Sequence, residues 1–318
     1  MNGNRLIDAR ELAEKGNFFD AIAIYNLLIN QVAHATLFFE RGFCFYKLGK
    51  HETAISDYDL AIKLDNKNSL FFYNRGVSKL QLHLFQEAIS DFQSAIALDD
   101  CNSDYYQSLG YSFSKIGKYN ESISNYSRAI ELNGTDINLF FDRGSVNKLM
   151  REYESAIVDF SKAIEMNQAE ERNYHLQTEF NPMKLIEIKE YNERLYYERA
   201  NCYFKQAEYS MVTMDFFNLV DRKTFLKDEE TNSLQNAISD FTASIKINPK
   251  SARYFFGRGN CYYYLMEFVK VIEDYSKAIE LKPNEKLFYQ ERAKVYKEMG
   301  KLNESNSDLE FAKSLVEK

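Results

Sequence analysis

Apolar residues in this chain of 318 residues fall at helical spacing, in paired runs separated by a short polar turn. Within residues 38–62 the apolar positions of the first run are Phe38, Gly42, Phe45 and Tyr46, and those of the second run are Ala54, Ile55, Tyr58, Ala61 and Ile62. The turn between the runs contains Gly49, and glycine is suited to end a helix in the left-handed conformation. The pattern predicts an antiparallel helical hairpin.

The hairpin pattern recurs every 34 residues (33 between the first two copies), and a pair of small residues marks each copy. The pairs are Ala9/Ala21, Gly42/Ala54, Gly76/Ala88, Gly110/Ser122, Gly144/Ala156, Gly259/Val271 and Ala293/Ser305, with one stretched copy at Ala200/Ala237. A fixed period of this length indicates a solenoid of stacked units. It overrides the two globular domains that the length alone suggests.

The first residue of each pair, called the first mark below, is glycine or alanine in every copy. Glycine costs a helix interior about 0.5–1 kcal/mol relative to alanine. Its recurrence therefore predicts that two helix backbones approach closely at this position.

Aromatic and small residues complete the pattern. The first helix begins with an aromatic residue at Phe38, Phe72, Tyr106, Phe140, Tyr196, Phe255 and Tyr289, and the second helix carries one at Tyr25, Tyr58, Phe92, Tyr126, Phe160, Phe241 and Tyr275. A last small position holds Ala61, Ala95, Ala129, Ala163, Ala278 and Ala312, and a closing proline remains only at Pro249 and Pro283. Over nearly the whole chain this pattern resembles that of the tetratricopeptide repeat (TPR) family.

The resemblance implies an all-α, right-handed superhelical solenoid of about eight TPR helix-turn-helix repeats, with residues 1–318 forming a single array. We expect repeats at about 2–34, 35–68, 69–102, 103–136, 137–170, 193–251, 252–285 and 286–318. Residues 171–192 and about 209–233 are read as insertions around the sixth repeat. In the first insertion, Asn181-Pro182 predicts the start of an additional or elongated helix. The second, apolar in its first half, is interpreted as a helix packed on the array or as a segment that fills the groove or reaches a partner.

Six copies share two further residues. Arginine precedes the first mark at Arg41, Arg75, Arg143, Arg199, Arg258 and Arg292, and aspartate precedes the second-helix aromatic at Asp57, Asp91, Asp159, Asp240, Asp274 and Asp308. The two copies that lack the arginine also lack the aspartate. This joint presence predicts a repeated ion pair between the two helices. The alternative is a ladder of arginines for anionic ligands.

Charge and composition limit the partners. The net charge of −7 makes a nucleic-acid backbone an unfavourable partner, and no apolar run approaches the ~18–20 residues of a membrane span. The first residues contain no apolar core of a secretory signal. Cys44, Cys202 and Cys261 share one repeat position and are interpreted as small buried residues, and reduced thiols fit the cytoplasm. We therefore expect a cytoplasmic protein that binds neither nucleic acid nor membrane.

Catalytic chemistry has no signature in the sequence. The four histidines occupy unrelated positions, and no cluster of histidine, cysteine or acidic residues has metal-ligand spacing. No phosphate-binding loop or nucleophile motif stands in a suitable context. The sequence favours a protein without enzymatic activity, metal or cofactor.

In the TPR family the first helices of the repeats line a concave groove that binds peptides or protein segments. With the first mark counted as position eight, the resemblance places positions 2, 5, 6, 9, 12 and 13 at this groove. The predicted peptide-binding residues are Phe39, Phe43, Tyr73, Asn74, Tyr111, Phe141, Tyr197, Asn201, Phe256, Asn260, Arg253 and Lys294. The alternative for the aromatic residues is that they pack against neighbouring first helices.

Three functional interpretations remain at this stage. The first is a non-catalytic scaffold that binds a protein or peptide ligand in the groove, where the asparagines would hydrogen-bond the peptide backbone. The second is an assembly protein that oligomerises through its insertions or convex face, with the groove filled by its own chain. The third and weakest is an enzyme. Chaperone-adaptor TPR domains hold the terminal carboxylate of a chaperone with a characteristic set of residues. Copies six to eight of this chain retain only Asn201 of that set, so the C-terminus of a chaperone is disfavoured as the ligand. The sequence leaves the oligomeric state open.

Overall fold

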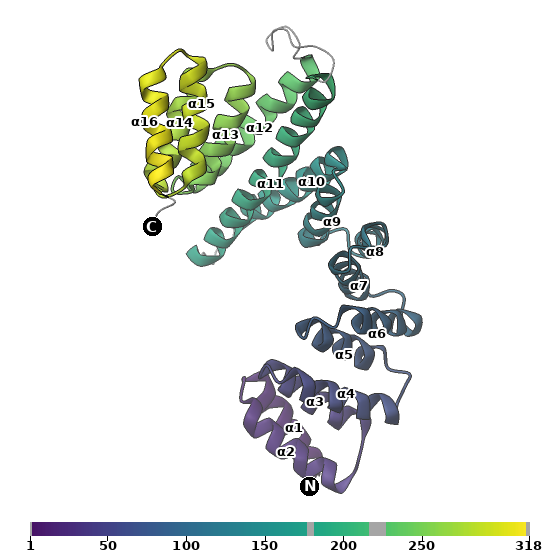
Figure 1. Cartoon of the computed structure of the whole chain (residues 1–318). Coiled ribbons are helices and arrows are strands. Elements are labelled where there is room, and N and C mark those ends of the chain that lie inside the picture. Colours follow the sequence, from purple (N-terminus) through teal and green to yellow (C-terminus); the bar gives the residue numbers. More distant parts are fainter. Residues whose placement is uncertain (1, 177–180, 216–226, 316–318) are drawn as a thin grey trace. The chain divides into compact units, whose positions relative to one another are not determined.

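The computed structural model describes residues 2–176, 181–215 and 227–315. Within these residues every regular element is a helix, and sixteen helices follow one another in packed pairs, which makes this part of the chain an all-α solenoid of TPR type (Figure 1). The chain divides into two compact units, Met1–Val146 and Asn147–Lys318.

The first unit contains four hairpins and most of a ninth helix. Its helices are α1 (Asn2–Glu14), α2 (Phe18–Gln31), α3 (Ala35–Lys47), α4 (His51–Leu64), α5 (Ser69–Gln81), α6 (Phe85–Leu98), α7 (Ser103–Lys115), α8 (Tyr119–Leu132) and the greater part of α9 (Ile137–Leu149). Each helix packs on the next from α1 to α8, and the first helices of successive hairpins touch, α3 with α5 and α5 with α7.

The second unit contains two long helices followed by regular hairpins. Its helices are α10 (Tyr153–Tyr174), α11 (Pro182–Asp215), α12 (Asp228–Ile247), α13 (Ala252–Tyr264), α14 (Phe268–Leu281), α15 (Lys286–Glu298) and α16 (Leu302–Ser314). Helix α11 is a single helix of 34 residues, so of the two predicted forms, additional or elongated, the structure has the elongated one. Asn181 caps its start, where Oδ1 accepts from the backbone N–H of Met183 at 3.0 Å.

Several expectations on organisation stay predictions. The boundaries of the repeats and insertions are among them, and so are the single array and the handedness of the superhelix. The interpretations of the second insertion depend largely on residues 216–226, which lie outside the described residues. On either side of that segment, α11 reaches Asp215 and α12 begins at Asp228.

The glycines at the first mark make room for an aromatic ring. A Cβ atom added at Gly42, Gly76 or Gly259 would lie 2.9, 2.7 or 2.6 Å from the ring of the second-helix aromatic residue of the same hairpin. The close approach predicted from the sequence is therefore present, but the neighbour at these three positions is a ring rather than a backbone. At Gly110 the backbone also contributes, because the carbonyl oxygen of Ser122 would lie 3.2 Å from such an atom.

The predicted Arg–Asp pairs brace the hairpins. Five of the six are present as two parallel hydrogen bonds of 2.6–3.0 Å, in which Nε and Nη2 of arginine donate to the two carboxylate oxygens: Arg41–Asp57, Arg75–Asp91, Arg199–Asp240, Arg258–Asp274 and Arg292–Asp308. The aspartates are buried, so these arginines neutralise buried charge instead of forming a ladder open to anions. The sixth pair, Arg143 with Asp159, has one member in each unit and stays a prediction.

The third arginine nitrogen, Nη1, joins each pair to the preceding hairpin. It donates to a polar residue on the preceding second helix in six places: Arg41 to Asn26, Arg75 to Asp59, Arg143 to Ser127, Arg199 to Ser161, Arg258 to Thr242 and Arg292 to Ser276. We did not anticipate this contact from the sequence, although its signal is present. A small polar residue directly follows the second-helix aromatic in every copy that precedes an arginine-bearing copy.

Candidate functional site

The aromatic side chains at position five of the first helices join neighbouring hairpins. Phe39 lies with its ring centroid 5.0 Å from Phe71 of the next first helix, and Tyr73 lies 4.9 Å from Tyr105 in the same way. The second unit repeats this arrangement, with Tyr197 at 5.2 Å from Tyr254 and Phe256 at 4.8 Å from Phe288. Phe141, the remaining predicted ring at this position, is buried.

These contacts correspond to the alternative stated for the aromatic stripe, packing against neighbouring first helices. The ring of Phe39 also lies 5.8 Å from Tyr58 of its own hairpin, so two hairpins hold it in place. Apart from the buried Phe141, the rings are half-buried, so part of each ring surface is accessible to solvent. Binding of a partner by them stays a prediction.

Position nine presents more accessible side chains. Phe43 is half-buried, with the ammonium group of Lys47 5.2 Å from its ring centroid. Tyr111 is exposed, and Lys115 lies 4.9 Å from its ring centroid. In both places a lysine one helical turn onward covers a ring face, an arrangement of cation–π type.

The three predicted asparagines already use part of their hydrogen-bonding capacity. Nδ2 of Asn74 donates to the carbonyl oxygen of Leu70, and Nδ2 of Asn201 donates to that of Tyr197, both at 2.8 Å. Oδ1 of Asn260 accepts from the hydroxyl of Tyr275 at 2.6 Å. The hydrogen bonds of these amides within the described residues leave donor or acceptor capacity unused on each of them.

The two predicted basic residues of the second unit are engaged within the chain. Arg253 lies over the rings of Tyr197 and Tyr254, at 4.5 and 4.9 Å from their centroids, and donates to the hydroxyl of Tyr254 at 2.8 Å. Lys294 pairs with Glu291 at 2.6 Å.

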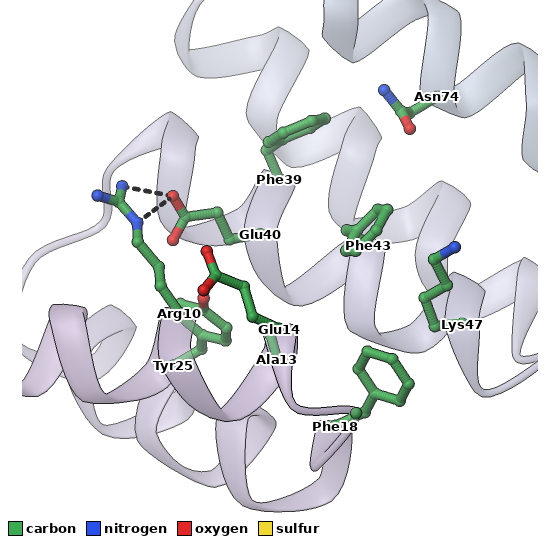
Figure 2. A pocket seen from close by; sticks show the side chains of 11 residues that line it. Arg10, Ala13, Glu14, Phe18, Tyr25, Phe39, Glu40, Phe43, Lys47 and Asn74 are labelled. Atoms are coloured by element: carbon green, nitrogen blue, oxygen red, sulfur yellow. Dashed lines mark hydrogen bonds and ion pairs between the residues drawn. The ribbon is translucent and has the colours of Figure 1, made fainter. Parts of the chain in front are cut away.

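A pocket of about 720 Å³ opens in the first unit, between α1, the start of α2, α3 and α5 (Figure 2). Three predicted site residues line it, namely Phe39, Phe43 and Asn74. Its other lining residues are Arg10, Ala13, Glu14, Gly16, Phe18, Tyr25, Glu40 and Lys47. The structure thus brings together side chains from three successive hairpins.

Most of the residues that line the pocket stand at the predicted groove positions, counted from the first mark. Arg10 and Glu14 stand at positions nine and thirteen of the first hairpin, and Glu40 and Lys47 stand at positions six and thirteen of the second. These four were not among the predicted site residues. The list of groove positions, applied to every residue type, would have identified them.

The charged groups of the pocket are unevenly distributed. Arg10 donates from Nε and Nη2 to Oε1 of Glu40, at 2.9 and 2.5 Å, and this hydrogen bonding raises the pKa of Arg10. Burial raises the pKa of the Tyr25 hydroxyl, and the charge of Glu40 adds to the effect. Figure 2 shows Arg10 and Glu40 at one end of the pocket, with Asn74 and Lys47 toward the opposite end.

In residues 2–176, 181–215 and 227–315 no group of three or more histidine, cysteine or acidic side chains is arranged to hold a metal ion. Among the helices of the described residues, none combines the length and apolar character needed to cross a membrane.

Family models with the description "Tetratricopeptide repeat" match residues 35–68, 103–136 and 252–285. Among solved structures, the chain is similar to the C-terminal part of a TPR repeat-containing protein from Cytophaga hutchinsonii, with 20% identity, coverage of 89% of this chain and 97% of that one, and a TM-score of 0.64. It is also similar to a tetratricopeptide repeat protein from Parabacteroides merdae ATCC 43184, with 14% identity, coverage of 96% of this chain and 98% of that one, and a TM-score of 0.53. A third similar structure is MamA from Desulfovibrio magneticus RS-1, with 16% identity, coverage of 53% of this chain and 96% of that one, and a TM-score of 0.51. At these identities the structural likeness shows the fold alone.

Proposed function

Because the chain is a tetratricopeptide repeat protein, we propose that it is a non-catalytic scaffold that binds a peptide or a segment of a partner protein at its first helices. Repeats of this family generally mediate protein–protein interaction. The proposal goes further in assigning binding to the groove positions of the first unit, and to the pocket between α1, α2, α3 and α5 in particular.

The observation that carries the proposal is the convergence of groove positions on one pocket. Its volume of about 720 Å³ lies within the ~300–1,000 Å³ typical of binding sites for small ligands, and it would accept a few side chains of an extended segment. Rings from Phe18, Phe39 and Phe43 supply apolar surface, and charged groups stand around them. Half-buried aromatic residues with a polar rim are the usual composition of a peptide-binding surface.

The same pocket argues for binding without chemistry. Its hydroxyl group, that of Tyr25, has a pKa raised by burial and by the nearby charge of Glu40, which disfavours the phenolate. The neighbouring Cys44 is buried, and burial raises the pKa of its thiol to about 11, which disfavours the reactive thiolate. Neither group is activated as a nucleophile.

The proposal is tested by selecting peptides on the full-length chain from a random library and measuring their affinity by fluorescence anisotropy. Phe43→Ala should weaken the selected peptides by about tenfold, because it removes a partly exposed ring from the pocket. Leu60→Ala is the matched control, since Leu60 is an exposed apolar residue of α4 that does not line the pocket.

Melting temperatures of both variants should stay close to that of the parent chain. Equal affinity of the parent chain and the Phe43 variant for every selected peptide would remove the pocket from the proposed function. Failure to select any peptide would count against peptide binding as a whole.

A further inference from the structure

One carboxylate oxygen in the pocket has no donor. Glu40 accepts both hydrogen bonds from Arg10 through Oε1, while Oε2 is buried and makes no hydrogen bond in the described part of the chain. The hydroxyl of Tyr25 lies near this carboxylate, and burial together with the charge and hydrogen bonding of Glu40 raises its pKa. Buried polar atoms are satisfied in the great majority of native structures. The carboxylate of Glu40 lines the pocket and has one oxygen without a hydrogen bond, so a cationic donor that reaches this carboxylate would be favoured.

Acceptors outnumber available donors at this end of the pocket. Glu14 is exposed and makes no hydrogen bond or ion pair with the described residues, so its carboxylate is a second acceptor. Arg10 already gives Nε and Nη2 to Glu40, while Asn74 and Lys47 lie toward the opposite end of the pocket (Figure 2). An acidic segment would leave both carboxylates without a partner, and a cationic one would supply donors to them.

The apolar part of the pocket suits the stem of a long cationic side chain. Phe39 is held between Tyr58 and Phe71, so its ring is fixed before any ligand arrives. Arginine and lysine place their methylene groups along such rings while the charged end reaches polar partners.

The charge of the whole chain acts in the same direction. Its formal net charge is −7, and a protein of this sign attracts cationic segments and repels acidic ones at low ionic strength. Local and global electrostatics therefore favour the same class of ligand.

We propose that this pocket selects a peptide segment with an arginine or lysine side chain next to a large apolar side chain. The guanidinium or ammonium group pairs with the carboxylates of Glu40 and Glu14, and the apolar side chain lies on Phe18 and Phe43. The proposal rests on the function proposed above and specifies the chemistry of its ligand.

The experiment begins with the sequences of the peptides selected on the full-length chain. They should be enriched in arginine or lysine directly beside a large apolar residue. One such peptide is then synthesised with arginine and with citrulline, which keeps the shape of arginine but carries no charge. The parent chain should bind the arginine form about tenfold more tightly, as expected for a charged hydrogen bond in a partly buried site.

Glu40→Gln should reduce this preference to less than about threefold, because the carboxylate that holds the cation is gone. Glu14→Gln is a second variant, on an exposed side chain that the fold does not depend on, and should reduce the preference by a smaller factor. Glu52→Gln, on an exposed glutamate of α4 away from the pocket, is the matched control and should retain the full preference.

The outcomes separate the two proposals. Selected peptides that lose affinity on Phe43→Ala but contain no enriched cation, or that bind equally as arginine and citrulline, would overturn the cationic specificity and leave the peptide-binding function standing. Enrichment of acidic residues that depends on Lys47 would also overturn it. Absence of any selected peptide would overturn both.

Discussion

At the scale of single residues, the turn inside each hairpin depends on one left-handed residue. Glycine occupies it at Gly16, Gly49, Gly117 and Gly300, with φ between 72° and 81°. Three other hairpins place His83, Arg151 and Met266 there, with φ of 59°, 64° and 61°. The left-handed conformation costs a residue with a Cβ roughly 1–2 kcal/mol, so these turns carry strain that the glycine turns do not.

Arg151→Gly should therefore raise the melting temperature, by a few degrees for a gain of about 1 kcal/mol. The side chain of Arg151 is exposed, so little packing is lost. Arg151→Ala is the control, because it removes the same side chain and keeps the strain. Thermal unfolding followed by circular dichroism distinguishes the two. A glycine variant no more stable than the alanine variant would show that this turn is not strained.

At the scale of elements, the arginine before the first mark links three helices. Arg258 on α13 donates from Nε and Nη2 to Asp274 on α14, both at 2.8 Å, and from Nη1 to Thr242 on α12 at 3.1 Å. The hydrogen bonds to Asp274 raise the pKa of Arg258 above its ordinary value. Because the same set recurs through the solenoid, it fixes both the hairpin and the step from one hairpin to the next.

Arg258→Met should destabilise the chain by about 3 kcal/mol, because it leaves the buried carboxylate of Asp274 without its cation. The double variant Arg258→Met with Asp274→Leu should cost much less, since no buried charge remains. Urea denaturation of the parent chain, both single variants and the double variant gives the coupling free energy between the two residues. Additive single effects would mean that the pair is not a stabilising unit.

At the scale of the whole molecule, the scaffold and assembly interpretations give the second insertion different roles. Its residues 216–226 lie outside the described residues, and α12 packs on α11 beyond them. The two interpretations differ in what they require of this segment. A groove that binds external peptides needs nothing from it, whereas an assembly protein would use it to contact a second copy or to fill its own groove.

Replacement of residues 216–226 by a glycine-serine linker of equal length should leave the molar mass in solution unchanged, as well as the affinity for selected peptides. Light scattering coupled to size exclusion measures the first quantity, and fluorescence anisotropy the second. A lower molar mass would favour assembly through the insertion. A gain in peptide affinity would favour an insertion that occupies the groove.

The helical hairpin, its period and the Arg–Asp pairs could be predicted from the sequence alone. A solenoid repeats the same hairpin, so the same residue pattern recurs in each copy. The joint presence of Arg41 with Asp57, and of their counterparts in other copies, therefore indicates a contact from the sequence alone, and the structure shows it. The part that could not be predicted is the nature of each neighbour. Gly42 was expected to face a backbone and faces the ring of Tyr58, because periodicity locates a face but not the atoms that fill it.

The candidate site depended on tertiary structure to a much greater degree. The sequence placed Phe39, Phe43 and Asn74 at the groove, and the pocket contains all three. Only the fold showed that Phe39 is packed against the next hairpin and that Arg10 meets Glu40 thirty residues away. The physical reason is that a repeat period determines which way a side chain faces. The contacts that bury a ring, pair a charge or leave an oxygen of Glu40 without a donor form between hairpins, where the particular residues of successive copies meet.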